Sequence, residues 1–203
     1  MKTTKNKTNF SFFIVEDYKF LDDLFGVTEE IRQILDSMNQ KVDKKKSNTI
    51  KELNDLIDNY PHIPQFKGLL VTLYDYLGNN QKFVEITEWI IKDHPDYIFG
   101  RILLASEYIY KEQFEKVPGI LGNPMGLKYL YPFRKEYHIS EVVSFYLITT
   151  FYFVGIGDLD EANLRLEILK NLKKKYSYSV TDDDIAQIDF VISKYKINKG
   201  IEW

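Results

Sequence analysis

The chain has 203 residues, of which 44% are hydrophobic and 15% aromatic, and its formal net charge is −3. This length and apolar share are typical of one globular domain with a substantial core. The mild acidic balance argues against a general nucleic-acid binder, and the absence of cysteine excludes disulfides, thiolate metal sites and a cysteine nucleophile.

The chain begins with polar residues 1–9 and continues with the apolar stretch FSFFIV at 10–15. This stretch is ambiguous between strand and helix. It is also a poor signal peptide, because it is short and Glu16 and Asp17 follow it at once. Residues 18–25 fit a helix better, since their apolar positions recur at helical spacing. We interpret residues 1–27 as an N-terminal segment, and one arrangement open to it is packing on the helices that follow.

From residue 28 onward, apolar periodicity and stop signals predict about nine helices in all, joined by short turns, with little or no strand. Thr28 is a good N-cap for the first clear helix. Pro61 and Pro95 end two later helices. Thr181 and Asp184 form a capping box that opens the last one. The chain is therefore expected to be all-α, as either a bundle or a helical solenoid.

The most apolar stretch is VVSFYLITTFYFVGIG, at residues 142–157. It falls short of the roughly 18 to 20 uncharged residues that a membrane span needs, and it leads directly into a charged amphipathic helix. We interpret it as a buried helix and expect a cytoplasmic protein with no membrane partner. The absence of cysteine fits a reducing compartment.

The two helix-ending prolines, Pro61 and Pro95, are 34 residues apart. The helices that follow them match at the same interval, in the pairs Lys67 and Arg101, Leu70 and Leu104, and Tyr74 and Tyr108. A helix–turn–helix period of 34 residues is the spacing of the tetratricopeptide repeat. Residues 64–95 accordingly resemble a tetratricopeptide repeat, with Gly78 in the place of that family's turn glycine.

The resemblance extends over residues 28–172 and indicates no subfamily. It implies a short right-handed solenoid of stacked antiparallel hairpins, with units at about 28–61, 64–97, 98–121 and 140–172, an irregular insertion at 122–139, and a C-terminal capping helix and tail at 173–203. The third unit departs from the family pattern, because Glu112 replaces the turn glycine and Pro118 interrupts its second helix.

Signatures of catalysis are missing from the sequence. It has no glycine-rich phosphate loop, no Gly-x-Ser-x-Gly and no His-Glu-x-x-His. The histidines, His62, His94 and His138, are scattered near prolines or loops, and we interpret them as caps of helix-end carbonyls rather than metal ligands. The sequence therefore predicts a non-enzymatic protein with no catalytic residue, metal or cofactor.

In the tetratricopeptide family the first helix of each hairpin lines a concave groove. The resemblance implies that the partner-binding residues are Thr72, Asp75, Tyr76, Phe99, Ile102, Ser106, Ile109, Tyr110, Leu147 and Phe151. Such a groove is apolar and aromatic, and it lacks the Lys, Arg and Asn of the family's carboxylate clamps. We expect it to bind an apolar or aromatic segment of a protein partner, or to be filled by the chain's own residues 10–18. Self-filling is slightly favoured, because an open apolar groove is a liability.

Two lysine clusters supply an alternative function. KVDKKK at 41–46 and KNLKKK at 170–175 both fall where a helix is expected to end. Cations complement the helix dipole there, which is the interpretation we prefer. If the two clusters met on one face, they would instead serve a binder of nucleic acid or another anionic ligand.

Overall fold

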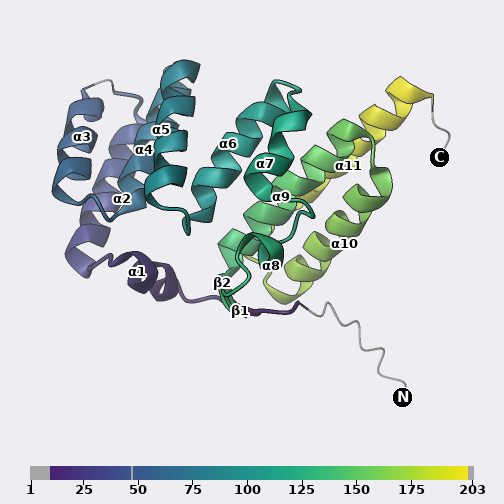
Figure 1. Cartoon of the computed structure of the whole chain (residues 1–203), viewed down its shortest axis with the longest axis horizontal. Coiled ribbons are helices and arrows are strands. Elements are labelled where there is room, and N and C mark those ends of the chain that lie inside the picture. Colours follow the sequence, from purple (N-terminus) through teal and green to yellow (C-terminus); the bar gives the residue numbers. More distant parts are fainter. Residues whose placement is uncertain (1–9, 47, 201–203) are drawn as a thin grey trace. The chain divides into compact units, whose positions relative to one another are not determined.

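The computed structural model describes residues 10–46 and 48–200, and this part of the chain is predominantly α-helical (Figure 1). It contains eleven α-helices, one 3₁₀ turn and two three-residue strands. The expected all-α class is confirmed. The chain divides into two compact units: an inserted unit, residues 16–107, and a discontinuous unit, residues 1–15 with 108–203.

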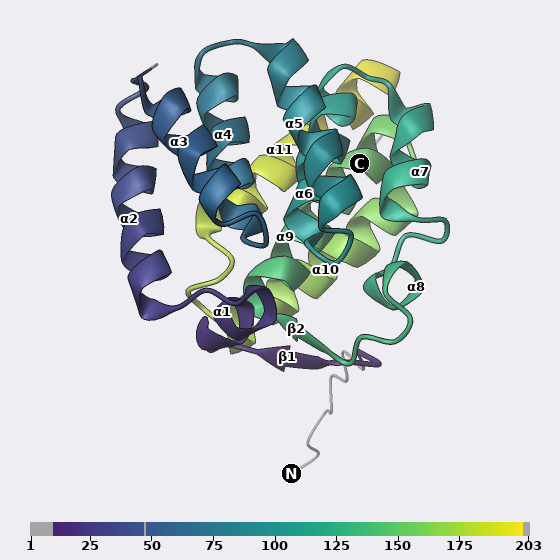
Figure 2. The same ribbon diagram turned by 60° about the vertical axis from the view of Figure 1, so that its left-hand side comes forward.

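The inserted unit consists of six helices, the last of which continues past residue 107. They are α1 (Lys19–Phe25), α2 (Glu29–Asp43), α3 (Thr49–Asn59), α4 (Pro64–Tyr76), α5 (Asn80–Asp93) and α6 (Ile98–Tyr110). α2 and α3 both pack against α4, and α4 packs against α5 (Figure 2). Consecutive helices thus form hairpins within this unit.

Local sequence signals account for the ends of these helices. The Thr28 hydroxyl accepts a hydrogen bond from the backbone N of Ile31 at 3.3 Å, so the predicted N-cap of α2 is confirmed. Asn79 caps α5 in the same way, and Pro64 is the first residue of α4. Gly78, between α4 and α5, has φ +69°, a conformation that a residue with a Cβ adopts at a cost.

The core of the inserted unit is built from the apolar stripes of its helices. Its buried members include Ile31, Leu35, Met38 and Val42 of α2, Leu53 and Ile57 of α3, Phe66, Leu70 and Leu73 of α4, and Phe83, Ile86 and Ile90 of α5. α6 approaches α5 closely at Gly100, where a Cβ would lie 2.5 Å from Cγ2 of Ile90. The glycine is therefore a packing requirement and leaves no room for alanine without a shift.

The discontinuous unit holds the remaining elements. They are β1 (Phe13–Val15), a 3₁₀ turn (Phe114–Lys116), α7 (Val117–Leu121), α8 (Leu127–Leu130), β2 (Glu136–His138), α9 (Ile139–Ile156), α10 (Leu159–Lys175) and α11 (Asp182–Lys199). α9 is central, because it packs against α10 and α11 and also contacts both strands. The predicted capping box of Thr181 and Asp184 opens α11.

The apolar N-terminal stretch contributes a strand rather than a helix. β1 and β2 pair in parallel, with Ile14 opposite Tyr137 (Figure 2). The ring of Phe12 lies 4.8 Å from the ring of Tyr137, and the ring of Phe10 lies 5.9 Å from the ring of Tyr146. We expected the segment at 122–139 to be irregular, with the option of one turn at 127–131; it holds α8 at that turn and also the strand that receives β1.

α9 is long and apolar enough to cross a membrane by length and composition, and among the described residues it is the one such helix. Just over half of it, 56%, is buried inside the protein. We expected this helix over residues 140–154; it begins one residue earlier, at Ile139, because His138 and Glu141 form a capping box there. It ends before Gly157, whose φ is +82°.

Candidate functional site

Lys67 of α4 is the centre of the first buried polar cluster, and only 1% of it is exposed. Its Nζ donates a hydrogen bond to Oδ2 of Asp93 at 2.8 Å. The same nitrogen lies 3.2 Å from Nε2 of His94 and 4.0 Å from the centroid of the Trp89 ring. These three neighbours of the ammonium group, Asp93, His94 and Trp89, all belong to the chain itself. We interpret the cluster as a structural connection between α4 and the end of α5.

The two ionisable neighbours of Lys67 are tuned by this arrangement. The hydrogen bond from Lys67 lowers the pKa of the Asp93 carboxyl below its usual value. Burial, with a further contribution from the Lys67 charge, lowers the pKa of His94. The His94 ring also hydrogen-bonds the backbone of Pro61. A neutral imidazole that donates from one nitrogen keeps the other as an acceptor for Lys67.

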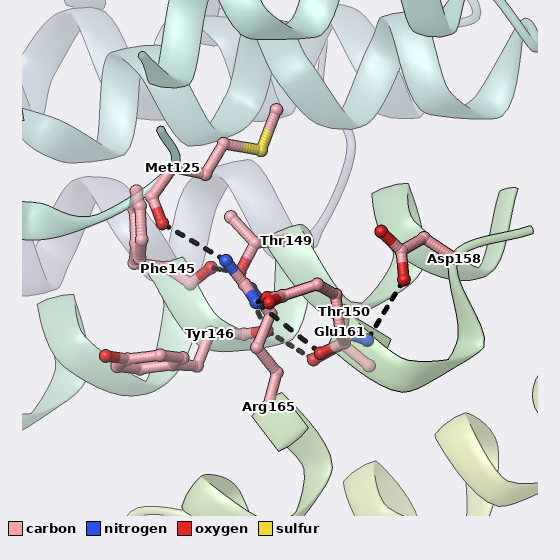
Figure 3. A network of polar contacts seen from close by, with 8 residues as sticks. All are labelled: Met125, Phe145, Tyr146, Thr149, Thr150, Asp158, Glu161 and Arg165. Carbon is pink, nitrogen blue, oxygen red and sulfur yellow. Dashed lines mark hydrogen bonds and ion pairs between the residues drawn. The ribbon is translucent and has the colours of Figure 1, made fainter. Parts of the chain in front are cut away.

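Arg165 of α10 is the centre of a second cluster, shown in Figure 3. Its Nε donates to the Thr149 hydroxyl of α9 at 3.2 Å, and its Nη2 donates to the backbone O of Met125 at 3.1 Å. Its Nη1 forms an ion pair with Glu161, and the guanidinium lies 4.1 Å from the ring of Phe153. These contacts join α9, α10 and the segment before α8. They engage all three guanidinium nitrogens, so the group is poorly placed to bind an anionic ligand.

A third cluster surrounds Glu141 in the first turn of α9, where only 1% of its side chain is exposed. Its Oε2 accepts hydrogen bonds from Arg134 at 2.6 Å and from the backbone N of His138 at 2.8 Å. Its Oε1 is buried without a hydrogen-bond partner in the described chain. Burial raises the pKa of Glu141 although Arg134 acts in the opposite direction, and burial raises the pKa of the neighbouring Tyr137 to about 12.

The predicted roles of the histidines hold only in part. His94 hydrogen-bonds the backbone of Pro61, which lies just past the end of α3. His138 instead caps the start of a helix, since its Nδ1 accepts a hydrogen bond from the backbone N of Ser140 at 3.2 Å. The sequence misses this role because histidine is an uncommon N-cap.

The ten residues predicted to bind a partner are divided between the two units. The inserted unit holds Thr72, Asp75, Tyr76, Phe99, Ile102 and Ser106, and the discontinuous unit holds Ile109, Tyr110, Leu147 and Phe151. Asp75, Tyr76 and Tyr110 are exposed, and the others are half-buried. The hydroxyls of Thr72 and Ser106 donate to carbonyls of their own helices. Partner binding by these residues stays a prediction.

The two lysine clusters lie in different units, 41–46 in the inserted unit and 170–175 in the discontinuous one. Lys41 forms an ion pair with Glu52, and Lys173 forms one with Asp182. Lys45 lies over the ring of Tyr76, 4.9 Å from its centroid. Part of the charge in each cluster therefore has an intramolecular partner, and lysines of both clusters occupy the last turns of α2 and α10.

A shallow, open groove between α2 and α3 is one of the concave surfaces that the sequence did not indicate. Its volume is about 560 Å³. It is lined by Glu30, Gln33, Ile34, Ser37, Met38 and Lys41 of α2, and by Glu52, Asp55 and Leu56 of α3. The apolar members form its floor and the polar members its rim. The lining residues of each helix recur every third or fourth position, which places them on one helical face.

This groove exists because α2 carries more apolar surface than α4 covers. Ile31, Leu35 and Met38 are buried in the core, whereas Ile34 is only half-buried and so is Leu56 on α3. The feature of the sequence that could have indicated this groove is the width of the apolar stripe on α2. Ile34 stands beside the buried positions rather than in line with them, which is typical of a second contact surface on the same helix.

Three carboxylates and one ammonium group surround the floor of the groove. Lys41 and Glu52 form an ion pair at the end nearest the α2–α3 turn. Glu30 and Asp55 are exposed, and no residue of the described chain pairs with them. The rim therefore carries two carboxylates without an ion-pair partner in the described chain, one in the first turn of α2 and one in the middle of α3.

In comparisons with known proteins, no protein-family model matches this chain, and neither a curated protein nor a solved structure matches it.

Proposed function

We propose that this chain is a non-enzymatic protein-interaction module or scaffold of the cytoplasm, with tetratricopeptide-like architecture, that binds a segment of a protein partner. The observation that carries the proposal is the α2–α3 groove, with half-buried apolar residues below a polar rim. Grooves between helices of this kind are where amphipathic segments dock. The buried polar clusters hold the chain's own elements together and provide no comparable site.

The turn positions support the tetratricopeptide-like part of the proposal. Gly78 and Glu112 are 34 residues apart, and both have positive φ, +69° and +55°. A non-glycine residue in this conformation is uncommon, so the left-handed turn recurs at the repeat interval even where the glycine does not. Leu70 and Leu104, also 34 apart, are both buried.

Two surfaces compete for the partner. The first is the α2–α3 groove. The second is the surface predicted from the repeat, represented on the inserted unit by Phe99 and Ile102, which are half-buried. We assign the partner to the groove, because its lining combines a concave shape, an apolar floor and two carboxylates without ion-pair partners in the described chain.

The test is affinity capture from a native lysate with the full chain. A groove variant, Ile34→Glu with Leu56→Glu, is compared with a variant of the second surface, Phe99→Asp with Ile102→Asp. We expect the groove variant to lose a partner that the other variant keeps, with circular dichroism confirming that both are folded. A partner that only the second variant loses would move the site to the predicted surface.

A rim variant, Gln33→Arg with Ser37→Arg, covers the case in which Ile34→Glu unfolds the protein, because both positions are exposed. The long side chains would occupy the groove without altering the core.

The paired lysines give no support to the nucleic-acid alternative. Salt-sensitive oligonucleotide binding that Lys44→Glu with Lys46→Glu abolishes would restore it.

A further inference from the structure

The lining of the α2–α3 groove also specifies a class of partner. We infer that it accepts a short, cationic, amphipathic α-helix, an inference that rests on the proposed function of the same site. Three features lead to it: the length of the groove, the chemistry of its walls and the charge of its rim.

The length of the groove suits a short helix. Its α2 wall runs from Glu30 to Lys41, a rise of about 16 Å or three turns, and its α3 wall from Glu52 to Leu56, a rise of about 6 Å or one turn. A partner helix of about three to four turns would lie along the α2 wall. Its apolar positions at intervals of three and four residues would meet Ile34 and Leu56 in the floor.

The walls favour a helix over an extended segment. Both walls are α-helices, whose mid-helix backbone groups are paired within each helix. An extended peptide would find no sheet edge here, and its own N–H and C=O groups would face apolar side chains without partners. A helical peptide satisfies its backbone internally and needs only side-chain contacts, which ridges packed into the groove supply.

The rim gives the sign of the partner's charge. Glu30, Glu52 and Asp55 contribute three negative charges, and Lys41 contributes one positive charge already paired with Glu52. The remaining carboxylates, Glu30 and Asp55, are exposed and are placed to pair with Lys or Arg beside an apolar stripe. Such pairs act mainly on association rate and specificity, and salt weakens them.

The experiment is a selection on the immobilised full chain from a displayed library of helix-forming peptides of about 14 residues, close to four turns. The library varies the charge of the positions that flank a fixed apolar stripe. We expect the enriched peptides to carry Lys or Arg at those positions. Enrichment of neutral or acidic flanks, or no enrichment at all, would overturn the inference.

The strongest enriched peptide is then synthesised and titrated against three proteins. Glu30→Lys with Asp55→Lys reverses the rim, and Asp36→Lys with Asp58→Lys is the matched control, because it changes two exposed acids of the same helices outside the groove lining. We expect the rim variant to bind about tenfold or more weakly than the wild type. The control variant should stay within about twofold, and affinity should fall as salt rises. An equal loss in both variants would contradict a specific role for the rim.

The outcomes separate this inference from the proposed function. If capture finds a partner that depends on the groove but the selected peptides are not cationic, the interaction module stands and this partner class falls. If the chain instead forms a concentration-dependent dimer by light scattering that the rim variant abolishes, a second copy is the occupant and the inference is wrong. If capture and selection both fail, both proposals fall.

Discussion

At the scale of single residues, the buried charges of this protein are stabilised by neighbours from other elements. Lys67 and Arg165 are almost fully buried, and each has both an acidic and an aromatic neighbour. A buried charge without a partner is costly, so pairing is a condition for keeping these residues in the core. How much each ion pair stabilises the protein depends on how far water can solvate the acidic partner.

We predict that Lys67→Met lowers the free energy of unfolding by about 1–2 kcal/mol. Methionine retains most of the apolar stem, but the contacts of Nζ with Asp93 and Trp89 are lost. The cost stays below that of a fully buried pair, because the Asp93 side chain is 40% exposed and water can solvate it. Urea unfolding followed by circular dichroism measures the change.

Lys82→Met is the matched control, because the Lys82 side chain is 43% exposed and pairs with Glu85 one turn away. It should produce no measurable change in the free energy of unfolding.

The same pair of variants tests the pKa of Asp93, which lies below its value in the unfolded chain. Its stabilising contribution is present above the unfolded pKa and is lost as pH falls through the folded pKa. In Lys67→Met, the free energy of unfolding should therefore fall less than in the wild type as the pH is lowered. An unchanged dependence on pH would contradict the pairing.

Glu141 should give a pH dependence of the opposite sign. Burial raises its folded pKa above the unfolded value, so the native state binds the proton more tightly. Between the two pKa values, stability therefore falls as pH rises. Glu141→Gln should remove this component. The urea midpoint of the wild type minus that of the variant, measured from pH 4 to 7, should decline as pH rises. A difference that does not change with pH would contradict the raised pKa of Glu141.

At the scale of elements, glycine positions decide how closely the helices pack. Gly155 lies in the last turn of α9, and a Cβ there would lie 2.2 Å from Cε1 of Phe114. Gly119 lies in α7, where an added Cβ would have open space within 4 Å, and its φ is not positive. The same substitution should therefore have opposite effects at the two positions.

We predict that Gly155→Ala destabilises the protein by about 1–3 kcal/mol, because the ring of Phe114 must move. Gly119→Ala should stabilise it by about 0.5–1 kcal/mol, because alanine restricts the unfolded chain and favours a helix. Thermal unfolding of both variants measures the two shifts. A gain in stability for Gly155→Ala would show that the Phe114 ring is free to move aside.

At the scale of the whole molecule, the chain enters the discontinuous unit, leaves it for the inserted unit and then returns. β1 belongs to the same unit as β2 and α9, although residues 16–135, which include the whole inserted unit, lie between β1 and β2 in sequence. The core of the inserted unit lies wholly within its own residues. This organisation implies that residues 16–107 carry the information for their own packing.

We predict that a fragment of residues 16–112, which retains the whole of α6, folds by itself. It should show a helical circular dichroism spectrum and one cooperative urea transition, because α2 to α5 share one apolar core. A fragment of residues 108–203 should be less cooperative, because it lacks β1 and the aromatic contacts of Phe10 and Phe12. A gradual, non-cooperative transition of fragment 16–112 would contradict the prediction.

The amino-acid sequence by itself determined the helical class, the caps at Thr28 and Thr181 and the left-handed turn at Gly78. These features depend on residues within one or two turns of each other, so local propensity and spacing suffice. Charge and motif arguments of the same kind led to the proposal of a non-enzymatic module.

Only the tertiary structure decided which distant segments meet. It pairs residues 13–15 with 136–138, brings Asp93 to Lys67 and leaves Ile34 and Leu56 half-buried between the core and a groove. Three-residue strands carry too little periodicity to be recognised, and the partner of a buried charge depends on packing between helices. Whether an apolar residue is core or contact surface depends on how much of it a neighbouring helix covers, which is a property of the fold and not of the residue.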